Sequence, residues 1–220
     1  MSLDEQRGTD RSRDGGEDRF VAMSAAHAAF RRDLEAMAKV ATPANLRNPA
    51  RHASIMSGWQ IFKNQLLIHH RHEDNFLWPR MRERLARSES AISTLDEMDA
   101  EHELVDPLLA AVEGAFDHPD DHDVAGVIDE LGTKLGFHLG HEEREAMPMI
   151  TESITDKEWR QVVSSIRETT PISSAAEFMP WLTDQASETE TKRILSILPA
   201  PARLIYRRVW KPRYDQVSHW

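Results

Sequence analysis

Two short segments of the chain repeat the same arrangement of histidine and glutamate. The first contains His69 and Glu73, and the second contains His138 and Glu142. Both pairs are four residues apart, so on a helix the two side chains of a pair project from one face. In each segment a proline follows six residues after the glutamate. Imidazole and carboxylate groups bind transition metals, so the repeat predicts a metal site to which two helices contribute equivalent ligands.

Apolar residues at helical spacing lead into both pairs. Ile55, Trp59, Phe62 and Leu66 precede His69, and Ile128, Leu131 and Leu135 precede His138. The pattern therefore places an imidazole and a carboxylate where a core residue is expected. Burying an ionised carboxylate is costly unless it is paired or bound to a metal. These stripes contain no lysine or arginine partner, so a metal explains the glutamates better than a buried salt bridge.

Two more helices are predicted from the same spacing, and each carries one histidine in its apolar stripe. They contain His27, within the stripe from Phe20 to Met37, and His102, within the stripe from Leu95 to Phe116. The other two helices are expected from about residue 51 to the late 80s and from about 122 to 148. Pro79 is expected to kink or break the former, and Ser93 or Thr94 to cap the helix that carries His102. Short connections between four amphipathic helices predict an all-α, antiparallel up-down four-helix bundle.

The predicted metal ligands are the stripe residues that can donate nitrogen or oxygen. They are His27, His69, Glu73, His102, His138 and Glu142. A pair of six-coordinate irons offers about twelve positions, of which four histidines and two bridging glutamates fill about eight. A bridging oxo or hydroxo group fills about two more, leaving about one per metal for water, dioxygen, peroxide or nitric oxide. Manganese or zinc also suits these donors, although structural zinc prefers a closed tetrahedron.

The arrangement resembles the hemerythrin-like, HHE cation-binding family. The resemblance rests on His27, on the run from His69 to Asp74 with its proline, on Glu101-His102-Glu103, and on the run from His138 to Glu143 with its proline, within about residues 20–150. It implies a four-helix bundle that holds two iron ions in a non-haem centre.

One position departs from the oxygen carriers of that family, which place a second histidine four residues after the one on the third helix. This chain has Asp106 there. Asp106, Glu101 or His72 could complete the ligand shell, or a position could stay open, which would favour oxygen activation or peroxide chemistry. His72 and His141 are expected beside the ligands or at the rim of the pocket. His70 is expected at the surface, and Phe30, Phe62, Phe76 and Phe137 in the core.

The resemblance and the ligand set predict a protein that binds or senses dioxygen, nitric oxide or peroxide. The alternatives are a di-iron oxidase, peroxidase or oxygenase acting on a small molecule, and an iron-buffering module. Whether the chain is an enzyme is left open at this point.

The composition narrows the classes of partner. A net charge of −10 over 220 residues disfavours nucleic acid. The absence of cysteine excludes disulfides, thiolate zinc sites and iron–sulfur clusters. No apolar run approaches the roughly 20 residues of a membrane span, and the polar N-terminus lacks a signal-peptide pattern, so a cytoplasmic protein is expected.

Three regions are expected along the chain. Residues 1–18 should form a disordered tail, 19–150 the bundle, and 151–220 a helical C-terminal extension with a basic, aromatic end. Helices are expected in the extension at Asp156–Glu168, Ser174–Ala186 and Thr189–Leu198. The extension is also the predicted contact of a homo-oligomer.

Overall fold

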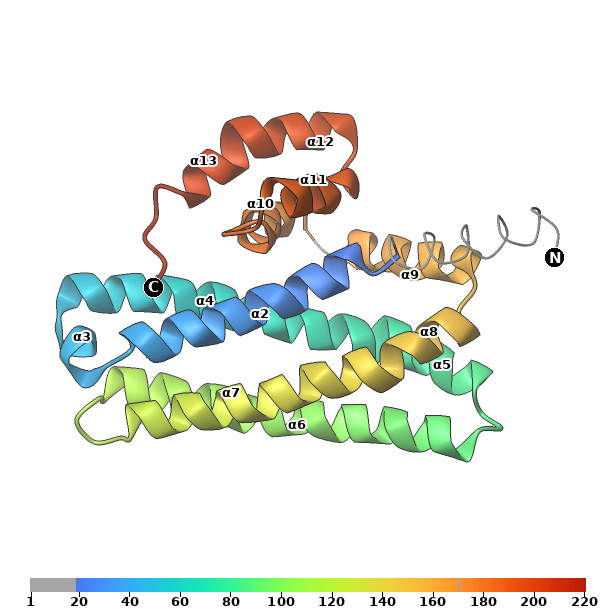
Figure 1. Ribbon diagram of the computed structural model, residues 1–220, viewed down its shortest axis with the longest axis horizontal. Coiled ribbons are helices and arrows are strands. Elements are labelled where there is room, and N and C mark those ends of the chain that lie inside the picture. Colours follow the sequence, from blue (N-terminus) through green and yellow to red (C-terminus); the bar gives the residue numbers. More distant parts are fainter. Residues whose placement is uncertain (1–18, 170) are drawn as a thin grey trace, which may run out of the picture. The chain divides into compact units, whose positions relative to one another are not determined.

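The computed structural model describes residues 19–169 and 171–220, and within them every regular element is a helix (Figure 1). The all-α fold class predicted from the sequence is therefore confirmed. The elements are α2 Val21–Val40, α3 Pro43–Arg47, α4 Pro49–His72, the π-helix η1 Glu73–Leu77, α5 Trp78–Arg84, α6 Glu89–Asp117, α7 Val124–His141, η2 Glu142–Ala146, α8 Met147–Ser153, α9 Asp156–Thr169, α10 Ile172–Leu182, α11 Glu188–Ser196, α12 Ala200–Ile205, η3 Tyr206–Trp210 and α13 Lys211–Tyr214. The predicted disordered tail lies outside the described residues.

The chain divides into two units by the contacts between its residues. Within the described residues, one unit contains 19–29 and 175–215, and the other contains 30–174 and 216–220. Helix α2 continues from one unit into the other without a break. The predicted boundary between a bundle and an extension at residue 150 stays a prediction.

Aromatic residues form the core of the second unit beside the predicted metal site. The ring of Phe30 on α2 meets Phe62 on α4 edge to face, with centroids 5.7 Å apart. Trp59 stacks on Phe62 and also meets Phe116 of α6, each at 5.7 Å. These contacts bring α2, α4 and α6 together, and each such pair adds roughly 0.5–1.5 kcal/mol beyond the burial of its apolar area.

Helix α6 begins earlier than the sequence pattern indicates. Ser88 is its N-cap, and its hydroxyl accepts a hydrogen bond from the backbone N–H of Ala91. The prediction of Ser93 or Thr94 as the cap is therefore wrong. Both residues are good capping types, but Glu89 to Ile92 continue the helix before them, so the cap lies one turn further upstream.

The proline that follows each glutamate does not break its helix. At Glu73 the backbone opens into a π turn, in which the carbonyl of Glu73 accepts from the N–H of Trp78, five residues later. Glu142 and Met147 form the same bond. Pro79 and Pro148 then stand in the first turn of the next α-helix, where a missing N–H costs least. The predicted kink or break at Pro79 takes the form of this widened turn just before the proline.

The π turn changes which residues face the core after Glu73. A continuous α-helix would bury Phe76, but that side chain is only half-buried. Leu77, Trp78 and Met81 are buried instead. The extra residue in the turn therefore shifts the apolar stripe by about one position, as a π-bulge does.

The last five residues pack on the first half of α4, within the second unit. The hydroxyl of Ser54 donates to Ser218, and Ser57 is hydrogen-bonded to His219. The indole of Trp220 lies directly over Gly58, so that a Cβ at position 58 would come within 2.5 Å of the ring. Glycine is required at this close approach of side chain to backbone.

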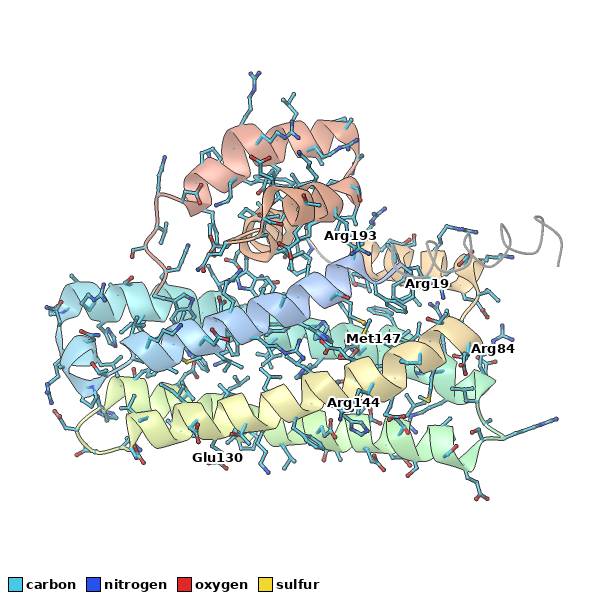
Figure 2. All side chains as sticks on the ribbon, in the orientation of Figure 1. Arg19, Arg84, Glu130, Arg144, Met147 and Arg193 are labelled. Carbon is cyan, nitrogen blue, oxygen red and sulfur yellow. The ribbon has the colours of Figure 1, made fainter. Side chains whose placement is uncertain are left out.

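Helix α9 also belongs to the second unit. Arg84 of α5, labelled in Figure 2, pairs with Glu158 near the start of α9. Hydrogen bonds from Thr155 and from Arg84 lower the pKa of Glu158 to about 2. The first unit contains α10 from residue 175 on and the helices from α11 to α13. There the buried hydroxyls of Thr183 and Tyr206 share a hydrogen bond of 2.7 Å.

The helices expected after residue 150 are present as α9, α10 and α11, with ends that differ by a few residues. No helix among the described residues has the length and apolar character needed to cross a membrane.

Candidate metal centre

Three histidines from three helices meet in the core of the second unit. His70 comes from α4, His102 from α6 and His138 from α7, and all three are buried. One ring nitrogen of each lies within 4.8 Å of the others. Nitrogens bound to one metal by bonds of about 2.0–2.1 Å also lie within a few ångströms of one another. The cluster therefore has the size of a coordination shell.

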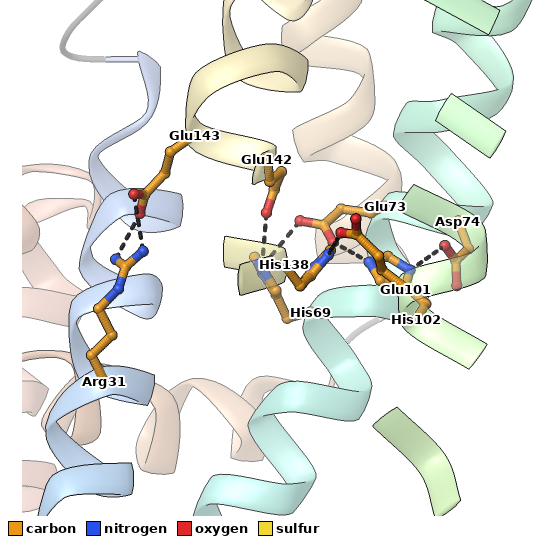
Figure 3. A network of polar contacts seen from close by, with 9 residues as sticks. All are labelled: Arg31, His69, Glu73, Asp74, Glu101, His102, His138, Glu142 and Glu143. Atoms are coloured by element: carbon orange, nitrogen blue, oxygen red, sulfur yellow. Dashed lines mark hydrogen bonds and ion pairs between the residues drawn. The ribbon is translucent and has the colours of Figure 1, made fainter. Parts of the chain in front are cut away.

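Two of these histidines are backed by carboxylates. Nδ1 of His102 lies 2.8 Å from Asp74, and Nδ1 of His138 lies 2.9 Å from Glu101 (Figure 3). Because a carboxylate only accepts, each Nδ1 must carry the proton. Nε2 of His102 and of His138 is buried and has no hydrogen-bond partner among the described residues. A buried lone pair without a donor is what a metal ligand presents.

Glu73 lies between this cluster and His69. One of its carboxylate oxygens is 3.1 Å from Nε2 of His69, and the other is 3.6 Å from Nε2 of His102 (Figure 3). Glu142 approaches the same His69 nitrogen at 4.0 Å. Glu73 thus spans two groups of nitrogens, as a carboxylate that bridges two cations would.

The position of Glu73 beside Glu142 makes its ionisation costly. Burial, followed by the negative charges of Glu142 and Asp74, raises the pKa of Glu73 well above its ordinary value. Cations between the carboxylates would remove this cost, because a bound metal is the largest local charge in its site.

His27 is fully buried on α2, three residues before Phe30. The ring of Phe30 lies 5.5 Å from that of His69. Residues three apart share a face of a helix, so the continuous α2 presents His27 and Phe30 on one side. The other five predicted ligands lie in the second unit, four of them buried and His69 nearly so.

The structure corrects the prediction for His70. It was expected at the surface, but it is buried and stacks on His102 with ring centroids 3.9 Å apart. The aligned position in the second segment is Leu139, which is also buried. That apolar residue was the sequence signal that the position faces the core.

The other candidates for completing the shell have different surroundings. Asp106 is exposed, and Glu101 bonds to histidines. His72 is half-buried beside Phe76, and burial followed by the charge of Arg71 lowers the pKa of His72. Phe137 is 60% exposed, so its predicted place in the core is wrong, whereas Phe30 and Phe62 are buried as expected.

Searches of the curated proteins and of the solved structures found no match to this chain. A family model described as the hemerythrin HHE cation binding domain matches residues 18–150. This match covers more than half of the chain and includes both histidine–glutamate segments. The chain therefore belongs to the hemerythrin HHE cation-binding family.

Proposed function

We propose that this protein holds two iron ions in the core of its bundle and uses them to bind or sense dioxygen, nitric oxide or peroxide. The observation that supports this most directly is the position of Glu73, with one oxygen beside His69 and the other beside His102. A carboxylate buried between two sets of nitrogens is explained by two cations, one on either side.

The ligands divide into two sets in this proposal. His70, His102 and His138 hold one metal, and His27 and His69 hold the other, with Glu73 and Glu142 shared between them. Their chemistry suits iron, since imidazole and carboxylate together bind it well. His27 is included because the face that α2 turns toward His69 through Phe30 also carries His27.

The five histidines and two bridging carboxylates fill about nine of the about twelve positions of two six-coordinate metals. The remaining positions are open to water and to a small ligand. When bound, the irons would supply a vacant coordination position and electrons to exchange with that ligand. The protein excludes water from the part of the site near His69, because the buried rings of Phe30 and Phe62 cover it.

Metal content and optical spectra test this function. We expect about two irons per chain, and a spectrum that changes on addition of oxygen, azide, nitric oxide or peroxide. Reversible oxygenation would indicate a carrier or sensor, and rapid peroxide breakdown an enzyme. Iron uptake without any response to small ligands would instead indicate a buffering module. A purified chain that binds no transition metal would overturn the proposal.

A further inference from the structure

We infer that Glu101 is a positioning residue, whose two carboxylate oxygens each hold one histidine N–H and thereby turn Nε2 of His138 toward the three-histidine cluster. This inference rests on the proposed metal site and adds a determinant of its affinity. The ligand pattern left Glu101 as one candidate for completing the ligand shell, and the family match assigns it no role.

Both oxygens of Glu101 are engaged. Oε2 lies 2.9 Å from Nδ1 of His138, and Oε1 lies 2.8 Å from Nδ1 of His141. Because a carboxylate oxygen only accepts, both histidines must direct an N–H at Glu101.

His141 fixes the carboxylate in turn. Its side chain is 14% exposed, and its ring packs 5.9 Å from that of Phe137. Its Nε2 lies 3.6 Å from the exposed carboxylate of Glu97. With His141 bonded to one oxygen, Glu101 cannot rotate away from His138 without losing a bond. His141 and Glu101 together thus orient the proposed ligand His138, although neither of them needs to touch the metal.

Asp74 provides an internal comparison, because it backs His102 alone. An asparagine in place of Asp74 keeps one amide oxygen for the single N–H of His102. A glutamine in place of Glu101 has one amide oxygen for two N–H groups, so only one of the two histidines keeps its hydrogen bond. The geometry therefore predicts that the amide is tolerated at position 74 and inadequate at position 101.

The tautomers of His138 and His141 in the metal-free full chain test the inference by ¹⁵N NMR. In the native chain we expect both to carry the proton on Nδ1. In Glu101→Met both should shift toward the Nε2–H form, and in Glu101→Gln one should shift. Asp74→Asn should leave His102 unchanged. The matched control is Glu103→Met, an exposed glutamate two residues along α6.

Metal affinity provides the second readout, measured by titration with Co²⁺ alone. Glu101→Met should weaken binding about 10–100-fold, the usual effect of losing a partner behind a metal-bound histidine. Glu101→Gln should fall between Glu101→Met and the native chain, and Glu103→Met should match the native chain. Native affinity in Glu101→Met, or Nδ1–H tautomers that persist in it, would overturn the inference.

The two proposals fail separately. The tautomers are read without metal, so they remain informative if the native chain binds none. In that case the proposed function falls while the arrangement of Glu101 and its histidines stands. Conversely, a native His138 with its proton on Nε2 would overturn the role of Glu101 even in a chain that loads two metals.

Discussion

The two histidine–glutamate segments share a backbone but differ in what their side chains contact. In both, an α-helix opens into a π turn at the glutamate and resumes before the proline. The residue after the first histidine is His70 in one segment and Leu139 in the other, and both are buried. One extra imidazole is thus the difference between a segment that supplies a histidine to each proposed metal and one that supplies a histidine to only one of them.

The acid that follows each glutamate also differs. Asp74 bonds to His102, whereas Glu143 forms a bidentate pair with Arg31 of α2, at 2.7 and 3.0 Å (Figure 3). Equivalent positions therefore serve a ligand in one segment and a helix contact in the other. The repeat determines where a side chain points, and its neighbours determine what it does.

A third π turn shows that the backbone feature alone does not make a site. It begins at Tyr206, and Pro212 follows six residues later, the same spacing as in the two segments. It contains no histidine or acid. The π turn is a way to carry a helix past a proline, and the metal-binding character comes from the residues added to it.

The largest expected effect comes from removing the bridge. Glu73→Ala should abolish loading of the second metal, because it removes one of the two carboxylates shared between the ligand sets. Elemental analysis should find at most one metal per chain, in a protein whose circular dichroism stays helical. Glu143→Ala, which removes a part-exposed acid next to Glu142 in the other segment, should keep two. Two metals in Glu73→Ala would contradict the bridging role.

Replacing the residue before each proline should reduce the stability of the protein by different amounts in the two segments. Trp78 is 1% exposed, while Met147 in the equivalent position is half-buried. Trp78→Ala should cost about 3–5 kcal/mol, as other large buried aromatics do. Met147→Ala should cost less than half as much. Denaturant unfolding of the metal-free chain measures both, and equal losses would show that the two helices are buried alike.

His70→Leu makes the first segment resemble the second. Leucine fills the space, so the metal-free chain should keep its stability within about 1.5 kcal/mol. The three-histidine metal should bind at least about 100-fold more weakly, since losing a ligand exceeds the loss of a partner behind one. Competition with a chelator measures this affinity. His72→Leu, on the same helix, should have native affinity, and unchanged binding in His70→Leu would exclude it as a ligand.

The raised pKa of Glu73 predicts a pH dependence of the metal-free chain. Above pH 4.5, the ordinary pKa of this carboxyl group, the unfolded state releases a proton that the folded state keeps on Glu73. The stability from this group is therefore fully present below pH 4.5 and is lost as pH rises through the raised pKa, by at most about 1.4 kcal/mol per pH unit. Urea unfolding of Glu73→Gln should lack this component. If the native chain and Glu73→Gln had the same pH profile of stability, the pH dependence could not be assigned to Glu73.

The smallest effect is expected at the ion pair of the second segment. Arg31→Met should cost below about 1 kcal/mol, because both partners are more than a third exposed. Thermal unfolding measures the change, and metal content should stay at the native value. A fall in metal content would mean that this pair supports the site as Asp74 does.

Much of the core could be predicted from spacing, because His69, Glu73, His138 and Glu142 continue apolar stripes that the fold buries. The burial of His70 was missed, because strict 3/4 stepping leaves this position outside the apolar stripe and only the aligned Leu139 indicated that it faces the core. The carboxylate partners of the histidines were also beyond prediction. Glu101 meets His138 only because α6 and α7 pack in one particular register, and no local pattern determines that register.

The seat of Trp220 over Gly58 has a consequence for residues 175–215. Chain that packs within the second unit flanks this region on both sides, so topologically it resembles an inserted segment with two attachments. A tethered anchor needs little intrinsic affinity, because its effective concentration reaches the millimolar range. A bulkier side chain at position 58 would release this C-terminal anchor, leaving the region held by its connection at residue 174 and by residues 19–29 of its own unit, which continue into the second unit through α2.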